Sequence, residues 1–291
     1  MTVSGFTFIR NGCSLGYPFL PAIRSLLPLC DEIIVNVPRS TDDTLATVRK
    51  LEDSRIRILE TDWDDNARTG GLALSHHTNL ALAQCTGDWC VYIQGDEVLH
   101  EATVPLMRQT MEKELYNPVV QGLVVDYTHF YGSYWTQTDG FGWYRQEVRV
   151  IRRDSHIRSR SDAQSFRTVK GEKLRVKRSG GHYFHYGHAR HPEMAARRLR
   201  EVSRLWHDDT GVDKISNRPA GFYDEDQKVR PFNGTHPSVM REAVAAANWT
   251  YDSRNPVIRF KRNCFWKDVA WLIKMATGIE IGVHRNFRLI R

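Results

Sequence analysis

The sequence predicts an α/β fold in which a mostly parallel, Rossmann-like sheet is flanked by helices and followed by a helical C-terminal extension. Residues 1–126 alternate between strand-like and helix-like patterns, which is typical of βαβ units with right-handed crossovers. The strand-like segments include continuous apolar runs such as EIIVNV at residues 32–37, as expected for strands buried on both faces. The 291 residues, 41% hydrophobic and 26% charged, are enough to bury a large core.

In the first half, short apolar runs predict strands, and apolar residues three and four positions apart predict helices. Pro28 ends the first helix, and Thr86-Gly87-Asp88 marks a turn before the fourth strand. Asp42 and Asp43 favour a helix start because acidic side chains suit its positive N-terminus. The expected order is strand 5–9, helix 19–27, strand 32–37, helix 40–51, strand 56–59, helix 72–84, strand 89–93, helix 102–115 and strand 121–126.

The second half has a less regular pattern. Residues 127–190 are rich in aromatic residues, glycine and arginine and show no helical periodicity, although an alternating pattern predicts a strand at 147–151. An amphipathic helix that begins with a proline is expected at 192–206, and another, ended by a glycine, at 266–276. We therefore divide the chain into a main domain at 1–206, with halves at 1–126 and 127–206, and an extension of loops and helices at 207–291 that packs on it.

Charge is unevenly distributed along the chain, although the net charge is only +7. Residues 1–140 hold 10 Lys or Arg and 18 Asp or Glu, whereas residues 141–291 hold 31 and 16. A basic half indicates either a solvated face or a partner with negative charge, such as an anionic lipid or a phosphorylated ligand. The sequence has no zinc-finger, RNP-like or basic-zipper pattern, so we expect no nucleic acid partner.

The C-terminal segment 259–291 combines basic residues with tryptophan and phenylalanine. Such a helix either docks on the core or makes a peripheral contact with an anionic membrane. No window approaches 18 uninterrupted apolar residues, so no transmembrane helix is expected. The N-terminus lacks a basic region followed by an apolar run, and the five cysteines form no C-x-x-C pair. We therefore expect a cytoplasmic protein, either free or on the inner face of the membrane.

Polar side chains follow each of the four predicted parallel strands. In such a sheet, ligands bind outside the carboxyl ends of the strands. The fourth strand ends in the carboxylate pair Asp96 and Glu97. Carboxylate oxygens suit Mg²⁺ or Mn²⁺, and these ions suit a diphosphate; alternatively, Asp96 caps the turn that follows. The polar groups at the strand ends are Arg10-Asn11, Arg39 to Asp43, Asp62 to Asp65 and Gln94 to Glu97.

Several motifs resemble those of family-2 glycosyltransferases and occur in the same order. The resemblance covers roughly residues 3–200, and an ordered set of motifs is more specific than any single one. The motifs are STDDT at 40–44, the Asn79-x-Ala81 pair, Thr86-Gly87-Asp88-Trp89 followed by Gly95-Asp96-Glu97 (similar to GDW…DADE), and SDAQSFR at 161–167 and HYGHAR at 185–190, which resemble the DAQxF and HYGxxR elements of one bacterial branch.

The resemblance implies a GT-A fold and an inverting transfer of sugar from a nucleotide-sugar donor to a carbohydrate or lipid-linked acceptor, assisted by Mn²⁺ or Mg²⁺. It implies that Asp96 holds the metal and that His185 is a metal or diphosphate ligand. It also implies that Asp162 is the general base, because the attacking hydroxyl must lose its proton, and that Arg190 neutralises the departing diphosphate. The structural alternatives are a helix N-cap for Asp162, a buried histidine for His185 and a surface arginine for Arg190.

The chain departs from the family pattern at two positions. Gln94 stands where the first Asp of the D-x-D motif is usual. Because Gln is a poor metal ligand, either the metal binds weakly or Glu97 holds part of it. Val37 stands where the nucleotide-reading Asp is usual, so neighbouring polar residues are the expected substitutes. His77 either contacts the diphosphate or caps a polar helix face. The residues expected to bind the donor are Arg10, Asn11, Arg39, Asp43, His77, Gln94, Glu97 and Arg190.

Two further segments carry open alternatives. The aromatic residues at 127–144 form either an acceptor cleft or a second small core, and Asp139 among them is the reserve candidate for the base. Histidines at 182, 185, 188 and 191 recur every third residue. On a strand this spacing would place them on opposite faces, which argues against a zinc site.

Two other functions compete with the transferase. A nucleotidyltransferase would carry a longer glycine-rich basic loop after the first strand than Arg10-Asn11-Gly12. A non-catalytic protein would use its basic half to bind a polyanion or a membrane surface. A non-catalytic binding protein would not explain the carboxylate pair Asp96 and Glu97 after the fourth strand.

Overall fold

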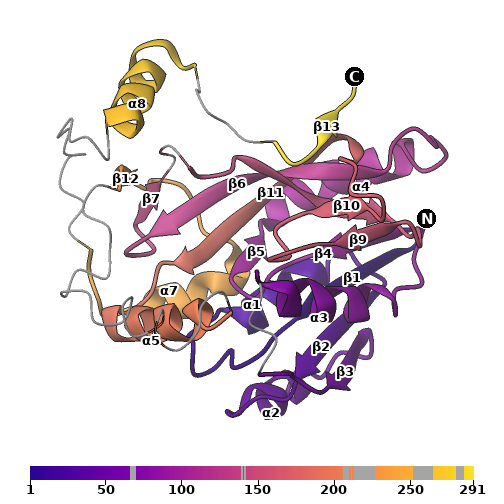
Figure 1. Ribbon diagram of the computed structural model, residues 1–291, viewed down its shortest axis with the longest axis horizontal. Helices are drawn as coiled ribbons and strands as arrows, with labels where there is room; N and C mark the ends of the chain where they lie inside the picture. The colour runs from indigo at the N-terminus through magenta and orange to yellow at the C-terminus, as the bar shows by residue number, and fades with distance from the viewer. Residues whose placement is uncertain are drawn as a thin grey trace.

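The predicted α/β fold is confirmed by the computed structural model, which has a twisted central sheet with helices on both sides (Figure 1). The structure describes residues 1–65, 70–138, 140, 142–205, 210, 212, 227–251, 265–279 and 285–291. Four parallel strands in the order β3-β2-β1-β4 form its N-terminal half, with helices as crossovers. These elements are β1 (Val3–Phe8), α1 (Phe19–Leu26), β2 (Glu32–Pro38), α2 (Thr44–Arg49), β3 (Ile56–Thr61), α3 (Leu72–Leu82) and β4 (Trp89–Tyr92).

The sheet continues beyond β4 through strands of both directions. A long strand at 175–188 pairs parallel with its neighbour β6. The sequence did not predict this strand, because its many polar residues and glycines interrupt any continuous apolar run. The further elements are β5 (Glu97–Leu99), η1 (Glu101–Thr103), α4 (Val104–Lys113), β6 (Gly122–Tyr131), β7 (Thr136–Thr138), β8 (Gln146–Arg152), β11 (Arg175–His188), β12 (Val229–Pro231) and β13 (Arg288–Leu289), with β9 (Ile157–Ser159) and β10 (Phe166–Thr168) as a separate two-stranded sheet.

Both faces of the sheet are covered by hydrophobic cores, which explains the continuous apolar runs in the sequence. Ile33 packs on one face, in the core that includes residues of α1 and α4. Its neighbour Ile34 packs on the other face, in the core that includes Ala81 of α3. Successive strand residues point to opposite faces, so a strand covered on both sides must be apolar throughout.

Helix α2 begins four residues later than the sequence pattern indicates. The carboxylate of Asp42 accepts hydrogen bonds from the backbone and hydroxyl of Thr44 and from the backbone of Ser14. A side chain that bonds its own backbone two residues on forms a turn rather than a helix. The segment 40–43 is therefore a loop that connects the end of β2 to the loop after β1.

The remaining helices lie beyond the parallel core. Helix α8 is tied to the segment before β12 by a buried ion pair in which Lys228 Nζ lies 2.5 Å from Asp268 Oδ1, and Gly278 ends it with a left-handed φ of 71°. Strand β13 then pairs with β11. Within the described residues, no helix is long and apolar enough to cross a membrane. The elements are α5 (Pro192–Ser203), η2 (Ser238–Met240), α7 (Arg241–Ala245) and α8 (Phe265–Thr277).

Candidate active site

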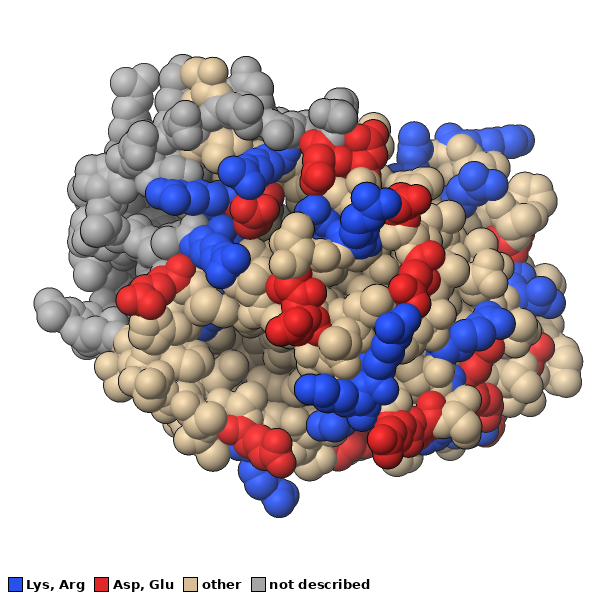
Figure 2. All heavy atoms as spheres, turned by 90° about the horizontal axis from the view of Figure 1, so that it is seen from below, with Lys and Arg blue, Asp and Glu red and all other residues tan. Residues whose placement is uncertain are grey.

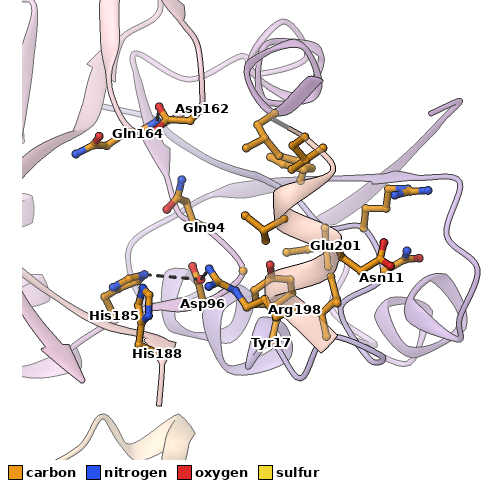
Figure 3. Close-up of a pocket in the computed structure, with 18 of the residues that line it drawn as sticks. Asn11, Tyr17, Gln94, Asp96, Asp162, Gln164, His185, His188, Arg198 and Glu201 are labelled. Carbon is orange, nitrogen blue, oxygen red and sulfur yellow. Dashed lines mark hydrogen bonds and ion pairs between the residues drawn. The ribbon is translucent and has the colours of Figure 1, made fainter. Parts of the chain in front are cut away.

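A cavity of about 400 Å³ lies at the carboxyl ends of β1 and β4, where the parallel sheet predicts it. Figure 3 shows side chains from distant parts of the sequence converging on it. Seen from below, the surface is hollowed, and both basic and acidic side chains border the hollow (Figure 2). The predicted residues that line the cavity are Arg10, Asn11, Gln94, Asp96, Asp162 and His185.

Asp96 is buried beside three basic side chains. Its Oδ2 lies 3.7 Å from His185 Nε2 and 3.5 Å from Arg198 Nη2 (Figure 3). Burial by itself would raise the pKa of Asp96, but His185, Arg198 and Arg190 outweigh it and hold the pKa well below its usual range. The carboxylate is therefore ionised at neutral pH and is a strong oxygen ligand.

His185 and His188 both line the cavity, contrary to the expectation that histidines at this spacing point to opposite faces. The pairing of β11 with β6 shifts register between these two residues. Such an irregularity re-aims the side chain that follows it. Among the described residues, however, no group of three His, Cys, Asp or Glu side chains gathers as a metal site. Asp96 and His185 lie together as a pair.

Asp162 lies in the loop between β9 and β10 and faces the cavity with Gln164 (Figure 3). Asp162 is not a helix N-cap, because the strand β10 rather than a helix follows it. Its carboxylate accepts a hydrogen bond from the Gln164 backbone at 3.2 Å. Ser161 and Ala163 on either side have left-handed φ values of 52° and 60°. Non-glycine residues rarely adopt this conformation, and where they do the strain often marks a functional loop.

Glu97 is not available to a donor or a metal ion, contrary to the prediction. Its two carboxylate oxygens accept from Arg149 Nε at 3.0 Å and Nη2 at 2.8 Å, and both side chains are fully buried. Tyr127 donates to the same carboxylate at 2.8 Å. Arg149 Nη1 also donates to the carbonyl of Gln164 at 2.7 Å. This pair therefore joins the loop that carries Asp96 to the loop that carries Asp162.

Replacing Arg149 by methionine is expected to lower the free energy of unfolding by about 3–5 kcal/mol, because it leaves the Glu97 carboxylate buried without its partner. Urea denaturation measures the change. The double variant Arg149→Met/Glu97→Leu should recover much of the loss, since it removes both charges. The exposed Arg39–Asp62 pair provides the control, because Arg39→Met should cost less than about 1 kcal/mol. Equal losses at the two positions would contradict this interpretation.

The other end of the cavity is built around Trp63. The Arg10 guanidinium lies 4.4 Å from the Trp63 ring and its Nη2 3.1 Å from Asp65 Oδ1. His77 stacks on Trp63 with the ring centres 4.8 Å apart. It does not line the cavity, and burial lowers its pKa to about 4. His77 is therefore a neutral support for Trp63 rather than a direct diphosphate contact.

Three further predicted residues lie away from the cavity. Arg39 pairs with Asp62 and, with Asp43, lines a separate shallow hollow beside α2. Arg190 is buried rather than at the surface, donates to the carbonyl of Leu15 at 2.5 Å and lies over the Tyr17 ring. It reaches Asp96 through its electric field but does not line the cavity.

Sequence reasoning missed several side chains of the site. Arg198 on α5 lies between Asp96 and Tyr17 (Figure 3). Nothing in the spacing of the amphipathic helix distinguishes it from Arg197 or Arg200. Only the position of α5 across the strand ends does so. Tyr144, from the aromatic segment 127–144, also lines the cavity. The missed residues are Tyr17, Trp63, Gln164, His188, Arg198 and Glu201.

The family is shown by the sequence match. The model of glycosyl transferase family 2 matches residues 19–170, which is more than half of the chain, and the chain belongs to this family. The protein is therefore a glycosyltransferase, and a nucleotide sugar is the donor type of its class. This result decides against the nucleotidyltransferase and the non-catalytic binding protein. No curated protein sequence matches the chain.

Two solved structures are among those similar to this chain. The first is Staphylococcus aureus TarS 1–349, with 14% identity and a TM-score of 0.39 over 74% of this chain and 69% of that one. The second is Mycobacterium tuberculosis glucosyl-3-phosphoglycerate synthase with Mn²⁺, UDP and glucosyl-3-phosphoglycerate, with 24% identity and a TM-score of 0.30 over 44% of each chain. The present chain spans 42% of the longer TarS structure.

Proposed function

We propose that the protein transfers a sugar from a nucleoside-diphosphate sugar to a hydroxyl group of a carbohydrate acceptor, with inversion at the anomeric carbon. The observation that carries this proposal is the shared cavity, in which Asp96 with its basic neighbours and Asp162 face the same space from separate loops (Figure 3). One group of residues suits a diphosphate, and the other suits an attacking hydroxyl.

The proposed reaction is a direct displacement. The acceptor oxygen forms a bond to the anomeric carbon while the bond from that carbon to the diphosphate oxygen breaks. Asp162 takes the proton of the attacking hydroxyl as general base, and the nucleoside diphosphate leaves with the electron pair. Arg198 stabilises the charge that develops on the leaving group, and Arg190 adds to the positive field. Arg10, Asn11, Gln94 and Trp63 bind the donor along the rest of the cavity.

The residues at the site fit a divalent cation. Asp96 supplies an ionised oxygen and His185 a ring nitrogen, a combination that suits Mn²⁺. A Cβ atom on Gly187 would lie 2.5 Å from His185 Nε2 and 2.7 Å from Asp96 Oδ2, so this glycine leaves space beside both ligands. Asp96 and His185 would hold the ion, which supplies positive charge to the diphosphate when bound.

The acceptor is proposed to be a glycan, free or lipid-linked. On α8, Trp266 is 73% and Phe265 41% exposed, and Lys267 and Lys274 belong to the same helix. Tryptophan beside lysine suits the surface of an anionic membrane. This combination supports a peripheral membrane contact of the extension at 207–291, while the main domain at 1–206 performs the transfer.

A nucleotide panel tests the proposed donor class. We expect one of UDP, GDP, CDP, ADP and dTDP to raise the melting temperature in the presence of Mn²⁺ and to do so less without it. A ligand at about 100 times its Kd stabilises the native state by about 2.7 kcal/mol, which a thermal-shift assay detects. Heparin at low salt is the control for charge alone. Stabilisation by heparin and by none of the nucleotides would contradict the proposed site.

A further inference from the structure

His129 is a fully enclosed histidine to which the proposed reaction gives no role. It lies on β6, directly beside His185 on β11 in the pairing of the two strands. Its Nδ1 lies 2.9 Å from His185 Nδ1, and its Nε2 lies 2.6 Å from the carbonyl oxygen of Tyr144. The rings of Tyr127, Trp143 and Tyr144 surround it. No motif in the sequence marks this residue.

The hydrogen bonds fix where the protons of this pair lie. A carbonyl oxygen only accepts, so His129 Nε2 must carry a proton. His129 is 1% exposed and enclosed by the rings of Tyr127, Trp143 and Tyr144, so a second proton on its ring would place a positive charge among aromatic side chains, away from water, which is costly. The Nδ1 atom of His129 is therefore an acceptor, and the proton between the two rings belongs to His185 Nδ1.

This arrangement has a consequence on the opposite side of the His185 ring. A neutral imidazole that carries its proton on Nδ1 has a lone pair on Nε2. In the structure, Nε2 is the atom that faces Asp96 Oδ2 at 3.7 Å, beside the space left by Gly187. A cation between these two atoms, either a proton on Nε2 or a bound metal ion, joins the two side chains, and in both cases the Nδ1 proton stays in the hydrogen bond to His129.

We propose that His129 is a positioning residue that holds His185 in the tautomer whose Nε2 lone pair faces Asp96. The proposal rests on the proposed function, in which Asp96 and His185 hold the metal ion. A hydrogen-bond acceptor behind a ligating histidine usually sets its ring orientation, and its loss weakens metal binding. In other proteins this acceptor is usually a carboxylate or a carbonyl, whereas here it is the Nδ1 atom of a second histidine, His129. The Tyr144 carbonyl in turn fixes the proton of His129 on Nε2.

The first experiment reads the tautomer directly. In the metal-free wild-type protein at pH 8, a long-range ¹H–¹⁵N correlation spectrum of the histidine rings should show His185 with a proton on Nδ1, the nitrogen that faces His129. The spectrum of His185→Gln identifies the signals. A His185 ring whose Nδ1 carries no proton would overturn the proposal. This measurement needs neither a metal ion nor a His129 variant.

A matched pair of variants supplies the second experiment. Asparagine at position 129 offers an amide oxygen to His185 Nδ1, whereas leucine has the same branching and no acceptor. We expect Mn²⁺ affinity, measured by the EPR signal of free Mn²⁺, to fall about 10- to 100-fold in His129→Leu and to stay within about threefold of wild type in His129→Asn. Circular dichroism verifies that each variant is folded.

The outcomes separate this proposal from the proposed function. Wild-type affinity in both variants would show that His129 does not position His185. If the wild-type protein itself binds no Mn²⁺, the proposed metal site is wrong, and the tautomer spectrum still decides whether His129 orients His185. A drop in affinity that asparagine does not rescue would indicate a packing role for His129 and would also overturn the proposal.

Discussion

Replacing Asp96 by asparagine is expected to remove the effect of Mn²⁺ on nucleotide binding and to lower kcat/KM at least about 100-fold, as loss of one preorganised charge contact does elsewhere. The neutral amide is a poor metal ligand. It also leaves His185, Arg198 and Arg190 without the carboxylate that now balances them. The three basic groups should still attract the diphosphate, so nucleotide binding should persist without depending on the metal.

The same substitution should cost stability without unfolding the protein. Because the pKa of Asp96 is held below its usual value in the folded state, its ionised form stabilises the fold above the ordinary carboxyl pKa, and this contribution disappears as pH falls through the folded-state pKa. At neutral pH the loss in Asp96→Asn should be on the order of 2 kcal/mol. Urea denaturation measures it.

Asp43→Asn is the matched control for Asp96→Asn. Asp43 also follows a parallel strand but lines the separate hollow beside α2. Its substitution should leave the thermal shift by nucleotide and Mn²⁺ unchanged. If Asp96→Asn keeps the full Mn²⁺ dependence, the metal is held elsewhere, and the assignment of His185 fails with it.

The sequence was sufficient to predict that the residues just after β1 and β4 lie together in the site, because the carboxyl ends of parallel strands meet at the same side of a sheet. Asn11 follows β1 and Gln94 follows β4, more than 80 positions later in the chain. Both line the cavity. The position of a residue just after a strand is a local property, and local patterns in the sequence predict it well.

Residue contacts across the fold could not be predicted in the same way. Asp96 and Glu97 are adjacent, yet one lines the cavity and the other begins β5 and faces inward to Arg149, 52 positions away. The direction of a side chain at a strand start depends on pairing that the sequence does not display. For the same reason the register shift in β11, which brings His188 into the site, was not foreseen.

The choice between two arginines shows the same limit of local patterns. Arg190 belongs to the HYGHAR motif, whereas Arg198 lies eight positions later in an amphipathic helix. The structure places Arg198 in the cavity and Arg190 behind Tyr17. The motif marks the end of β11, but the helix that follows it supplies the side chain that reaches Asp96.

Asp162→Asn is expected to keep donor affinity and to lower kcat by about 10²- to 10⁴-fold, the range over which a general base contributes. The amide oxygen can still accept the hydrogen bond that the Gln164 backbone now donates to the carboxylate, so the loop should keep its shape. The amide cannot take a proton. Release of nucleoside diphosphate from UDP-, GDP- and dTDP-sugars, with water or added glycan as acceptor, measures kcat, and the thermal shift by nucleotide measures affinity.

Asp154→Asn is the control for this prediction. Asp154 precedes β9 in the same part of the chain, accepts from the backbone of His156 at 2.8 Å and does not line the cavity. It should keep full activity. Full activity in Asp162→Asn would assign the base to another residue, and Asp139, which lies outside the described residues, is the next candidate. Loss of both donor affinity and kcat would instead mean that the Asp162 loop shapes the donor site, because a base acts only on the acceptor.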